Sequence, residues 1–414
     1  MTPYVGLVAS KCYMCHAPSG VGRSQNSLSP HYARTDISWL KIAVPNWYVK
    51  NSSPFNEIVA GGDSTITASV EYPQGVFTRI LWGGNVTGTL VDGTTTLSDQ
   101  TTVAIPNGAL FWIRMYIVGS TNVFSRIFAF NPNHIPASQQ WMGAEAFTAD
   151  KTMGGTITKT NATFCPIAII GPTDKPSIAL LGDSIGIGEL DGRGDLSGDY
   201  GLARAFGDRY AYLNFALSGD RAAGFLAGGA RRADVLKYAS HLLCAYGNND
   251  IYTLGDSAAI TFGRLQNIWQ LMKAHGQDKK TFQTTISVRA TSTDGWTTLA
   301  NQTTLSGNAA RVSLNALIRA GDPDLDGYID FADVLESSRE SGKWKPGPTA
   351  NYLTSDGTHP VTQGYFFIKE SGAFYIPDST VGGGAAMTVQ SGQDDREKNQ
   401  GGTGILTKSA GPSI

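Results

Sequence analysis

SIALLGDSIG, residues 177–186, joins a short apolar run to a glycine-rich turn. The run 177–181 is typical of a buried strand in a parallel sheet, because such strands are covered on both faces and show no alternation. Ser184 falls where this strand ends and the chain turns toward a helix. Ligands of open α/β sheets bind at this edge. A turn serine alone is more often a helix cap, so a functional role requires partners elsewhere in the chain.

The residues after Pro176 alternate between strand-like and helix-like segments, which predicts a parallel sheet with crossover helices. The expected strands are 177–181, 210–217, 240–246, 281–288 and 328–331, and the expected helices are 222–239, 257–275, 308–320 and 363–372.

The residues before this region have a different sequence pattern, with short β-rich runs broken by Gly, Asn and Asp. The runs are 65–72, 76–82, 101–105 and 109–118, and 156–170 reads as a last strand and connector. Strands at this spacing predict a β-sandwich or a jelly roll. Tyr72, Trp82, Trp112 and Tyr116 are candidates for a sugar-binding face, although such aromatic side chains more often fill a sandwich core.

These changes in sequence pattern divide the chain into four parts. We expect an N-terminal arm or attachment segment over 1–45 and a β-sandwich, a candidate carbohydrate-binding domain, over 46–170. An α/β domain follows over 171–378, and a Gly-rich extension over 379–414. The arm and the extension are candidate contacts in a homo-oligomer or a larger assembly.

Composition excludes several classes of partner. The formal net charge is −2 and the pI is about 6.3, which gives no reason to expect nucleic acid or an anionic membrane. No run approaches the roughly 20 apolar residues that span a bilayer. Charged residues make up only 16% and glycines number 49, a composition common in secreted or particle-associated proteins. We expect an extracellular or virion-associated protein, although the N-terminus shows no signal peptide.

The four cysteines could serve as a haem-attachment site, as disulfides or as free thiols. Cys12-Tyr-Met-Cys15-His16 matches the pattern of c-type haem attachment, but the neighbouring residues supply neither an apolar pocket nor a distal ligand. We therefore expect no cofactor. A local disulfide, an inter-chain link or free thiols remain possible for Cys12 and Cys15. Cys165 and Cys244 lie in apolar runs and are expected to be small buried hydrophobic residues.

Four polar blocks follow the predicted strands or lie in an equivalent loop before the last helix. They are 182–184 (GDS), 217–220 (LSGD), 247–250 (GNND) and 356–360 (DGTHP). Because the carboxyl ends of parallel strands meet at one edge of a sheet, all four blocks can converge on one site.

In this order the blocks resemble those of the SGNH (GDSL-like) hydrolase superfamily, which carry Ser, Gly, Asn and an Asp-x-x-His pair. The resemblance covers about 200 residues, from 176 to 377. It implies an α/β fold with a flavodoxin-like parallel sheet, preceded here by a separate all-β sandwich or jelly-roll domain.

The resemblance also implies a role for each block. Ser184 would be the nucleophile, His359 the general base and Asp356 the acid that orients it. The backbone amides of Ser184 and Gly219 and the side-chain amide of Asn249 would form the oxyanion hole. The residue chemistry agrees, because a histidine with an ordinary pKa near 6.5 accepts a hydroxyl proton at neutral pH. A neutral amide donor stabilises an oxyanion by about 3–4 kcal/mol.

A second motif suggests a metal site. Asp322, Asp324, Asp326, Asp330 and Asp333 have the spacing of an EF-hand loop, with Asp in place of the bidentate Glu. The same segment supplies the fifth strand, and acidic turns before strands are common. We therefore favour a turn and a strand here, and expect no metal.

The sequence thus predicts a serine esterase that removes ester groups, O-acetyl groups in particular, from a carbohydrate or polysaccharide. Its partner is an ester-bearing substrate such as an acetylated glycan. The alternative is a glycan-binding structural component of a virus particle or cell surface that retains the hydrolase fold.

Overall fold

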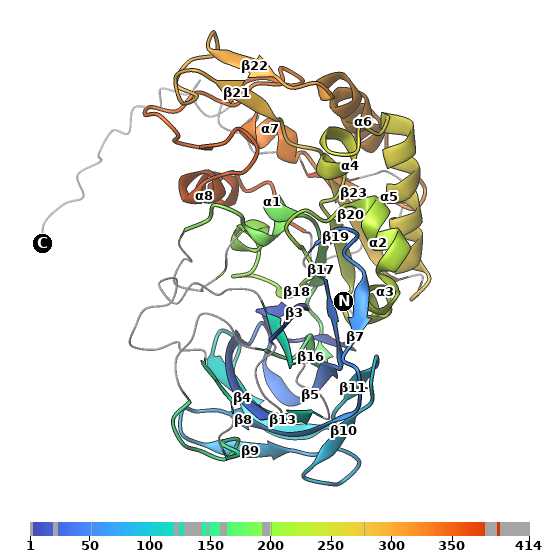
Figure 1. The fold of residues 1–414 in the computed structure, drawn as a ribbon, viewed down its shortest axis with the longest axis vertical. Helices are drawn as coiled ribbons and strands as arrows, with labels where there is room; N and C mark the ends of the chain where they lie inside the picture. Colours follow the sequence, from blue (N-terminus) through green and yellow to red (C-terminus); the bar gives the residue numbers. More distant parts are fainter. Residues whose placement is uncertain are drawn as a thin grey trace, which may run out of the picture.

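A parallel sheet organises the second half of the chain in the computed structural model (Figure 1). Its strand order is β2-β18-β17-β19-β20-β23-β24, and every neighbouring pair is parallel. The strands are β2 (Cys12–Tyr13), β17 (Ser177–Leu181), β18 (Ala211–Asn214), β19 (His241–Cys244), β20 (Lys280–Thr284), β23 (Gly327–Ile329) and β24 (Met387–Val389). The five central strands have the 2-1-3-4-5 order of flavodoxin-like sheets, which confirms the predicted fold class.

The structure describes residues 3–19, 24–50, 52–119, 124–127, 143–146, 149–157, 164–192, 199, 201–276, 278–376 and 387–389. Most of the predicted extension 379–414 lies outside these residues, and its described part is β24. No helix among the described residues is long and apolar enough to cross a membrane.

Helices connect and flank the strands of the parallel sheet. They are α1 (Ser184–Ile187), α2 (Ala222–Gly228), α3 (Ala230–Val235), α4 (Asn248–Tyr252), α5 (Ala258–Lys273), α6 (Asn308–Ala320), α7 (Phe331–Leu335) and α8 (Thr362–Glu370), with 3-10 turns η2 (Gly201–Ala205) and η3 (Leu236–Tyr238). The α6 bounds match the predicted helix. The predicted helix 222–239 is broken at Gly229, where a Cβ would collide with the carbonyl oxygen of Phe225.

The N-terminal half is all-β, as predicted, and lies below the α/β domain in Figure 1. Its strands pair mainly antiparallel, while β3 and β6 are parallel. One sheet has the order β1-β16-β5-β11 with β12 beside β5, another has β10-β8-β13-β4-β15 with β9 beside β8, and a third has β14-β3-β6-β7. The strands are β1 (Tyr4–Leu7), β3 (Cys15–Ser19), β4 (Ser24–Tyr32), β5 (Ile37–Pro45), β6 (Trp47–Val49), β7 (Glu57–Val59), β8 (Ser64–Glu71), β9 (Phe77–Ile80), β10 (Gly88–Leu90), β11 (Thr95–Leu97), β12 (Thr101–Ile105), β13 (Leu110–Gly119), β14 (Phe124–Ile127), β15 (Gly143–Ala146) and β16 (Ala168–Thr173).

The prediction of an N-terminal arm over 1–45 is wrong. These residues form β1 to β5, and β4 lies between β13 and β15 inside a sheet. The sequence of β4, SQNSLSPHY, is mostly polar and did not read as a strand. Several of its buried polar side chains are hydrogen-bonded: Asn26 donates to Ala149 O at 2.8 Å, and Ser29 Oγ lies 2.8 Å from Nε2 of His31.

The structure also tests the predictions made for the aromatic residues and the cysteines. Trp82 and Trp112 are buried, so they fill the core rather than line a sugar-binding face. Cys12 is a buried free thiol, and burial raises its pKa to about 12. Cys244 is buried as expected.

The acidic segment 322–333 forms the predicted turn and strand, with β23 inside it. Its carboxylates contact cations: Asp326 pairs with Lys273 and Lys280, and Asp330 pairs with Arg319 at 2.8 Å. Asp333 also contacts Arg319, at 3.1 Å, while Asp322 and Asp324 accept hydrogen bonds from Gln266 and Gln270 of α5.

Candidate active site

Ser184 lies at the first position of α1, directly after β17. The helix is capped by Asp183, whose Oδ1 accepts the backbone N–H of Ile185 at 2.9 Å. Gly186 allows the turn to pack closely, because a Cβ there would lie 2.8 Å from Cβ of Ala216. The hydroxyl is thereby held at the carboxyl edge of the sheet, and the Ser184 side chain remains in contact with the loop before α8.

The structure brings together the three residues of the predicted triad. Nε2 of His359 lies 2.7 Å from Oγ of Ser184, and Nδ1 of His359 lies 2.6 Å from Oδ2 of Asp356. A carboxylate only accepts hydrogen bonds, so Nδ1 carries the proton and Nε2 is the acceptor for the Ser184 hydroxyl. This geometry lets the imidazole remove the hydroxyl proton while the carboxylate stabilises the resulting charge.

The loop that carries the acid and the base is fixed to the segment after β20. Gly357 has a φ of +75°, and its carbonyl oxygen accepts the Ala290 N–H at 3.1 Å and Nε1–H of Trp344 at 3.0 Å. A Cβ on Gly357 would collide with the carbonyl of Ala290. Glycine is therefore required at this position for Asp356 and His359 to point toward the serine.

The hydrogen bonds around Asp356 keep its carboxylate ionised. Burial alone would raise its pKa, but hydrogen bonds from the His359 ring and from the backbone N–H groups of His359 and Thr358 lower it below the ordinary value. Its side chain is 42% exposed, and the His359 side chain is 18% exposed. The acid and the base thus lie at the rim of the site rather than deep inside the protein.

The predicted oxyanion donors lie on neighbouring loops. Among the described residues the backbone N–H groups of Ser184 and Gly219 have no acceptor. Gly219 adopts a φ of +84° after β18. Asn249, at the start of α4, donates from Nδ2 to the carbonyl oxygen of Asp220 at 2.9 Å, which places its amide beside the Gly219 loop. Its second Nδ2 hydrogen remains available to a substrate oxygen.

Two other acidic residues of the blocks, Asp250 and Asp183, accept hydrogen bonds from backbone N–H groups of neighbouring loops. Asp250 accepts the backbone N–H groups of Ala222 and Ala223 at the start of α2, at 3.0 and 3.1 Å. Asp183 is buried, and this burial raises its pKa to about 6. Its Oδ2 has no hydrogen-bond partner among the described residues.

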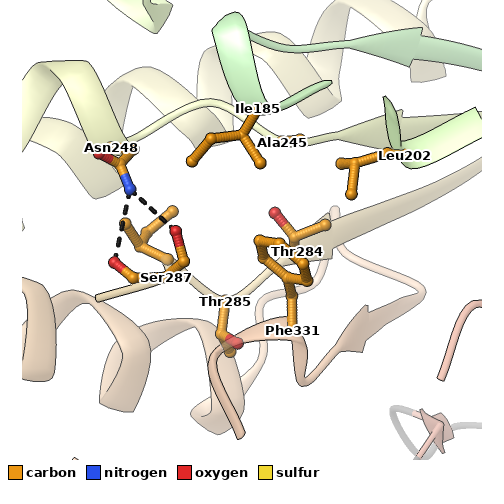
Figure 2. Close-up of a pocket in the computed structure, with 9 residues that line it drawn as sticks. Ile185, Leu202, Ala245, Asn248, Thr284, Thr285, Ser287 and Phe331 are labelled. Carbon is orange, nitrogen blue, oxygen red and sulfur yellow. Dashed lines mark hydrogen bonds between the residues drawn. The ribbon is translucent and has the colours of Figure 1, made fainter. Parts of the chain in front are cut away.

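A small pocket lies behind the site, between the nucleophile turn and the end of β20. Figure 2 shows Ile185 on one side and Asn248, Ser287 and Phe331 on the others. Nδ2 of Asn248 donates to Ser287 Oγ at 3.1 Å and to the Ser287 carbonyl oxygen at 3.4 Å. These bonds hold the start of α4, where the proposed oxyanion donor Asn249 lies, against the segment after β20.

The β domain also reaches this site. Phe55, in the loop between β6 and β7, has a φ of +60°, and its ring lies against Gly219. Glu57, the first residue of β7, pairs with the guanidinium of Arg232 at 3.2 Å, and Arg232 also pairs with Asp220 at 2.8 Å. A buried ion-pair chain thus joins the β domain to the residue that follows Gly219.

Comparison with known proteins identifies the class. Residues 180–365 match the GDSL-like Lipase/Acylhydrolase family, and this segment contains the triad and strands β18, β19, β20 and β23 of the parallel sheet. The α/β domain therefore belongs to the SGNH (GDSL-like) hydrolase superfamily, a class of carboxylic ester hydrolases. A search of curated proteins finds no match.

Solved structures give weaker likenesses. A peptidoglycan O-acetylesterase is 11% identical with a TM-score of 0.40, over 90% of this chain and 76% of that one. A carbohydrate esterase family 3 protein from Talaromyces cellulolyticus is 16% identical with a TM-score of 0.31, over 47% and 93%. A salicylyl-acyltransferase from a tetracycline biosynthetic pathway is 14% identical with a TM-score of 0.32, over 84% of this chain and 79% of that one. Likenesses this distant say nothing about the substrate.

Sequence reasoning missed two neighbours of the site. Arg289 donates from Nη2 to Oδ1 of Asn249 at 2.6 Å. Its position directly after the fourth predicted strand was a usable signal, because residues there lie at the active edge of the sheet. Phe55 had no such signal, since it belongs to the other domain and only the tertiary structure brings it to Gly219.

Proposed function

We propose that this chain is a serine ester hydrolase that works through an acyl-serine intermediate. The observation that carries the proposal is the hydroxyl–imidazole–carboxylate series of Ser184, His359 and Asp356, with separations of 2.7 and 2.6 Å. A serine hydroxyl is a weak nucleophile until a base takes its proton, and His359 lies within hydrogen-bonding reach of it.

The reaction follows from these contacts. Nε2 of His359 accepts the hydroxyl proton as Oγ of Ser184 attacks the ester carbonyl, and Asp356 stabilises the imidazolium. The tetrahedral intermediate collapses with cleavage of the ester C–O bond, and His359 returns the proton to the leaving alcohol. Water, activated by the same imidazole, then releases the acyl group as a carboxylic acid and restores Ser184.

The negative oxygen of the tetrahedral intermediate needs donors that are already in place. The N–H groups of Ser184 and Gly219 and the Nδ2 group of Asn249 fill this role in the proposal. Two of them lack an acceptor among the described residues, and Asn249 retains one hydrogen. Donors without an internal acceptor need not break a bond before they bind the developing charge.

The substrate in this proposal is an O-acetylated carbohydrate chain. The exposed fractions of Asp356 and His359, 42% and 18%, favour an ester presented on a large substrate at an open rim. The contact of Phe55 with Gly219 supports a polymer that lies across both domains. An acetyl group is small enough to be cleaved without a long acyl channel.

The proposal is tested by hydrolysis of p-nitrophenyl acetate by the wild type and by Ser184→Ala. We expect loss of activity in the variant, because it lacks the hydroxyl that lies 2.7 Å from Nε2 of His359. Equal background rates in both would instead favour the glycan-binding alternative. Acetate release from a panel of native acetylated polysaccharides tests the substrate class, and release from none of them would reject the carbohydrate.

A further inference from the structure

Arg289 forms a short contact with the side chain of Asn249, one of the proposed oxyanion donors. Its Nη2 donates to Oδ1 of Asn249 at 2.6 Å, and Thr253 Oγ1 donates to the same oxygen at 3.3 Å. A guanidinium has donors only, so the atom that faces Arg289 must be the amide oxygen. The amide nitrogen is then directed away from Arg289, toward the carbonyl oxygen of Asp220 at 2.9 Å.

The guanidinium is held in place by its surroundings. It lies over the ring of Tyr252, with the carbon of the guanidinium 5.2 Å from the ring centre. Burial lowers its pKa, whereas the charges of Asp183 and Asp356 oppose this change. An arginine remains charged under these conditions. Its Nε is buried without a hydrogen-bond partner among the described residues.

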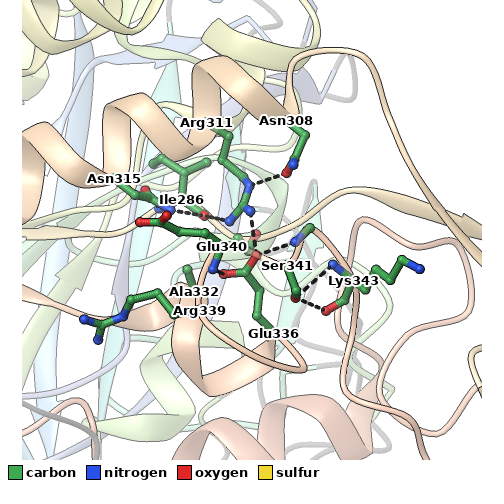
Figure 3. Close-up of polar contacts among 12 residues, drawn as sticks. Ile286, Asn308, Arg311, Asn315, Ala332, Glu336, Arg339, Glu340, Ser341 and Lys343 are labelled. Carbon is green, nitrogen blue, oxygen red and sulfur yellow. Dashed lines mark hydrogen bonds and ion pairs between the residues drawn. The ribbon is translucent and has the colours of Figure 1, made fainter. Parts of the chain in front are cut away.

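The backbone before Arg289 is fixed by α6. Asn315 accepts the Ile286 N–H at 2.6 Å and donates to the Ile286 carbonyl oxygen at 3.0 Å, as a neighbouring strand would. Figure 3 shows Arg311 beside it, with bonds to Ile286 O at 3.4 Å and to Glu336 at 2.5 Å. On the other side of Arg289, the Ala290 N–H is bonded to the loop that carries the proposed base. The segment therefore delivers the guanidinium to Asn249 in one defined position.

We propose that Arg289 is a positioning residue of the oxyanion hole, which fixes and polarises the side-chain amide of Asn249. The inference rests on the proposed function of this site. A charge-assisted hydrogen bond to Oδ1 is stronger than a neutral one, and it prevents rotation of the amide. Withdrawal of electron density by the guanidinium makes the remaining Nδ2–H a better donor to the negative oxygen. Arg289 thus acts through Asn249 and need not touch the substrate.

The test is a double-mutant cycle with p-nitrophenyl acetate. For Arg289→Met we expect kcat to fall by about 10- to 100-fold with little change in KM, less than the loss from deleting a donor outright. In an Asn249→Ala background the same substitution should have almost no further effect, because the group through which it acts is gone. Effects that multiply in the double variant would overturn the inference. Arg289→Gln, which keeps a neutral donor, should recover part of the loss.

A control separates this role from a structural one. Arg319→Met removes another half-buried guanidinium, which pairs with Asp330 and Asp333. It should lower the melting temperature and leave kcat unchanged. A similar fall in kcat for both arginine variants would reject a specific role for Arg289.

A second readout does not depend on turnover. In ¹⁵N-labelled protein the side-chain amide signal of Asn249, assigned by its loss in Asn249→Ala, should shift in Arg289→Met and remain unchanged in Arg319→Met. An unshifted signal would overturn the inference even in an active enzyme. A shifted signal in a protein without Ser184-dependent hydrolysis would support the contact and reject the esterase function instead.

Discussion

Replacing Gly219 with alanine perturbs the proposed oxyanion loop in two ways. Gly219 has a φ of +84°, which costs a residue with a Cβ about 1–2 kcal/mol. The added Cβ would also lie 2.9 Å from Cζ of Phe55, closer than such contacts occur. Because Phe55 is only 6% exposed, the ring cannot simply swing into solvent, and the loop must move. This movement carries the Gly219 N–H away from the developing negative oxygen.

The size of the effect follows from that displacement. Removal of one oxyanion donor lowers kcat by about 10²–10³-fold, and we expect a loss in this range for Gly219→Ala on p-nitrophenyl acetate. KM should change little, because the donor contributes mainly in the transition state. The free energy of unfolding should fall by about 1–3 kcal/mol from strain and overpacking together.

The chain offers a matched control for the strain. Gly75, between β8 and β9, has a φ of +85°, and nothing lies within 4 Å of a Cβ built there. Gly75→Ala should therefore cost similar backbone strain and leave kcat unchanged. The double variant Phe55→Ala/Gly219→Ala removes the collision, so it should regain part of the activity lost in Gly219→Ala.

Steady-state kinetics and urea unfolding of the wild type and these three variants test both effects. Gly219→Ala with an unchanged kcat would refute the role of this N–H in stabilising the oxyanion. A double variant no more active than Gly219→Ala would show that contact with the β-domain loop is not what displaces the donor.

Two further predictions concern the acidic residues beside the serine. Asp356→Asn keeps an oxygen for the backbone but loses the acceptor for Nδ1 of His359, so kcat should fall by about 10²–10⁴-fold; activity near that of the wild type would contradict the triad. Burial raises the pKa of Asp183 to about 6 from 3.8, so the folded protein binds this proton more tightly and loses stability as the pH rises from about 4 through 6. Asp183→Asn has no carboxyl group to ionise, so it does not lose stability in this way. The difference in unfolding free energy between the variant and the wild type should therefore rise by about 3 kcal/mol in favour of the variant from pH 4 to pH 7 in urea titrations. A difference that does not vary with pH would contradict this account of Asp183.

Local sequence was sufficient for the elements that have a regular pattern of apolar residues. The apolar run of β17 and the helical period of α6 predicted both elements, and α6 has the expected bounds. The triad residues were also predictable, because each follows a recognisable strand or precedes a helix. The predicted strand 281–288 ends at Thr284, since Ile286 is bonded to the side chain of Asn315 rather than to a neighbouring strand.

Other features depend on contacts that no local pattern encodes. The polar sequence of β4 contradicts ordinary strand preferences, and it is stabilised by partners such as Ala149 more than a hundred residues away. Glu57 and Arg232 meet only because the two domains pack together. The same is true of Phe55, so the contribution of the β domain to the site was visible only in the folded protein.

The central claim is that the hydroxyl of Ser184, activated by His359, becomes acylated. Reaction with diethyl p-nitrophenyl phosphate, followed by mass spectrometry of the digested protein, tests this directly. The account predicts one diethylphosphoryl group on Ser184 in the wild type, no labelling of Ser184→Ala and very slow labelling of His359→Ala. Label on a different residue, or ester hydrolysis that persists in Ser184→Ala, would contradict it.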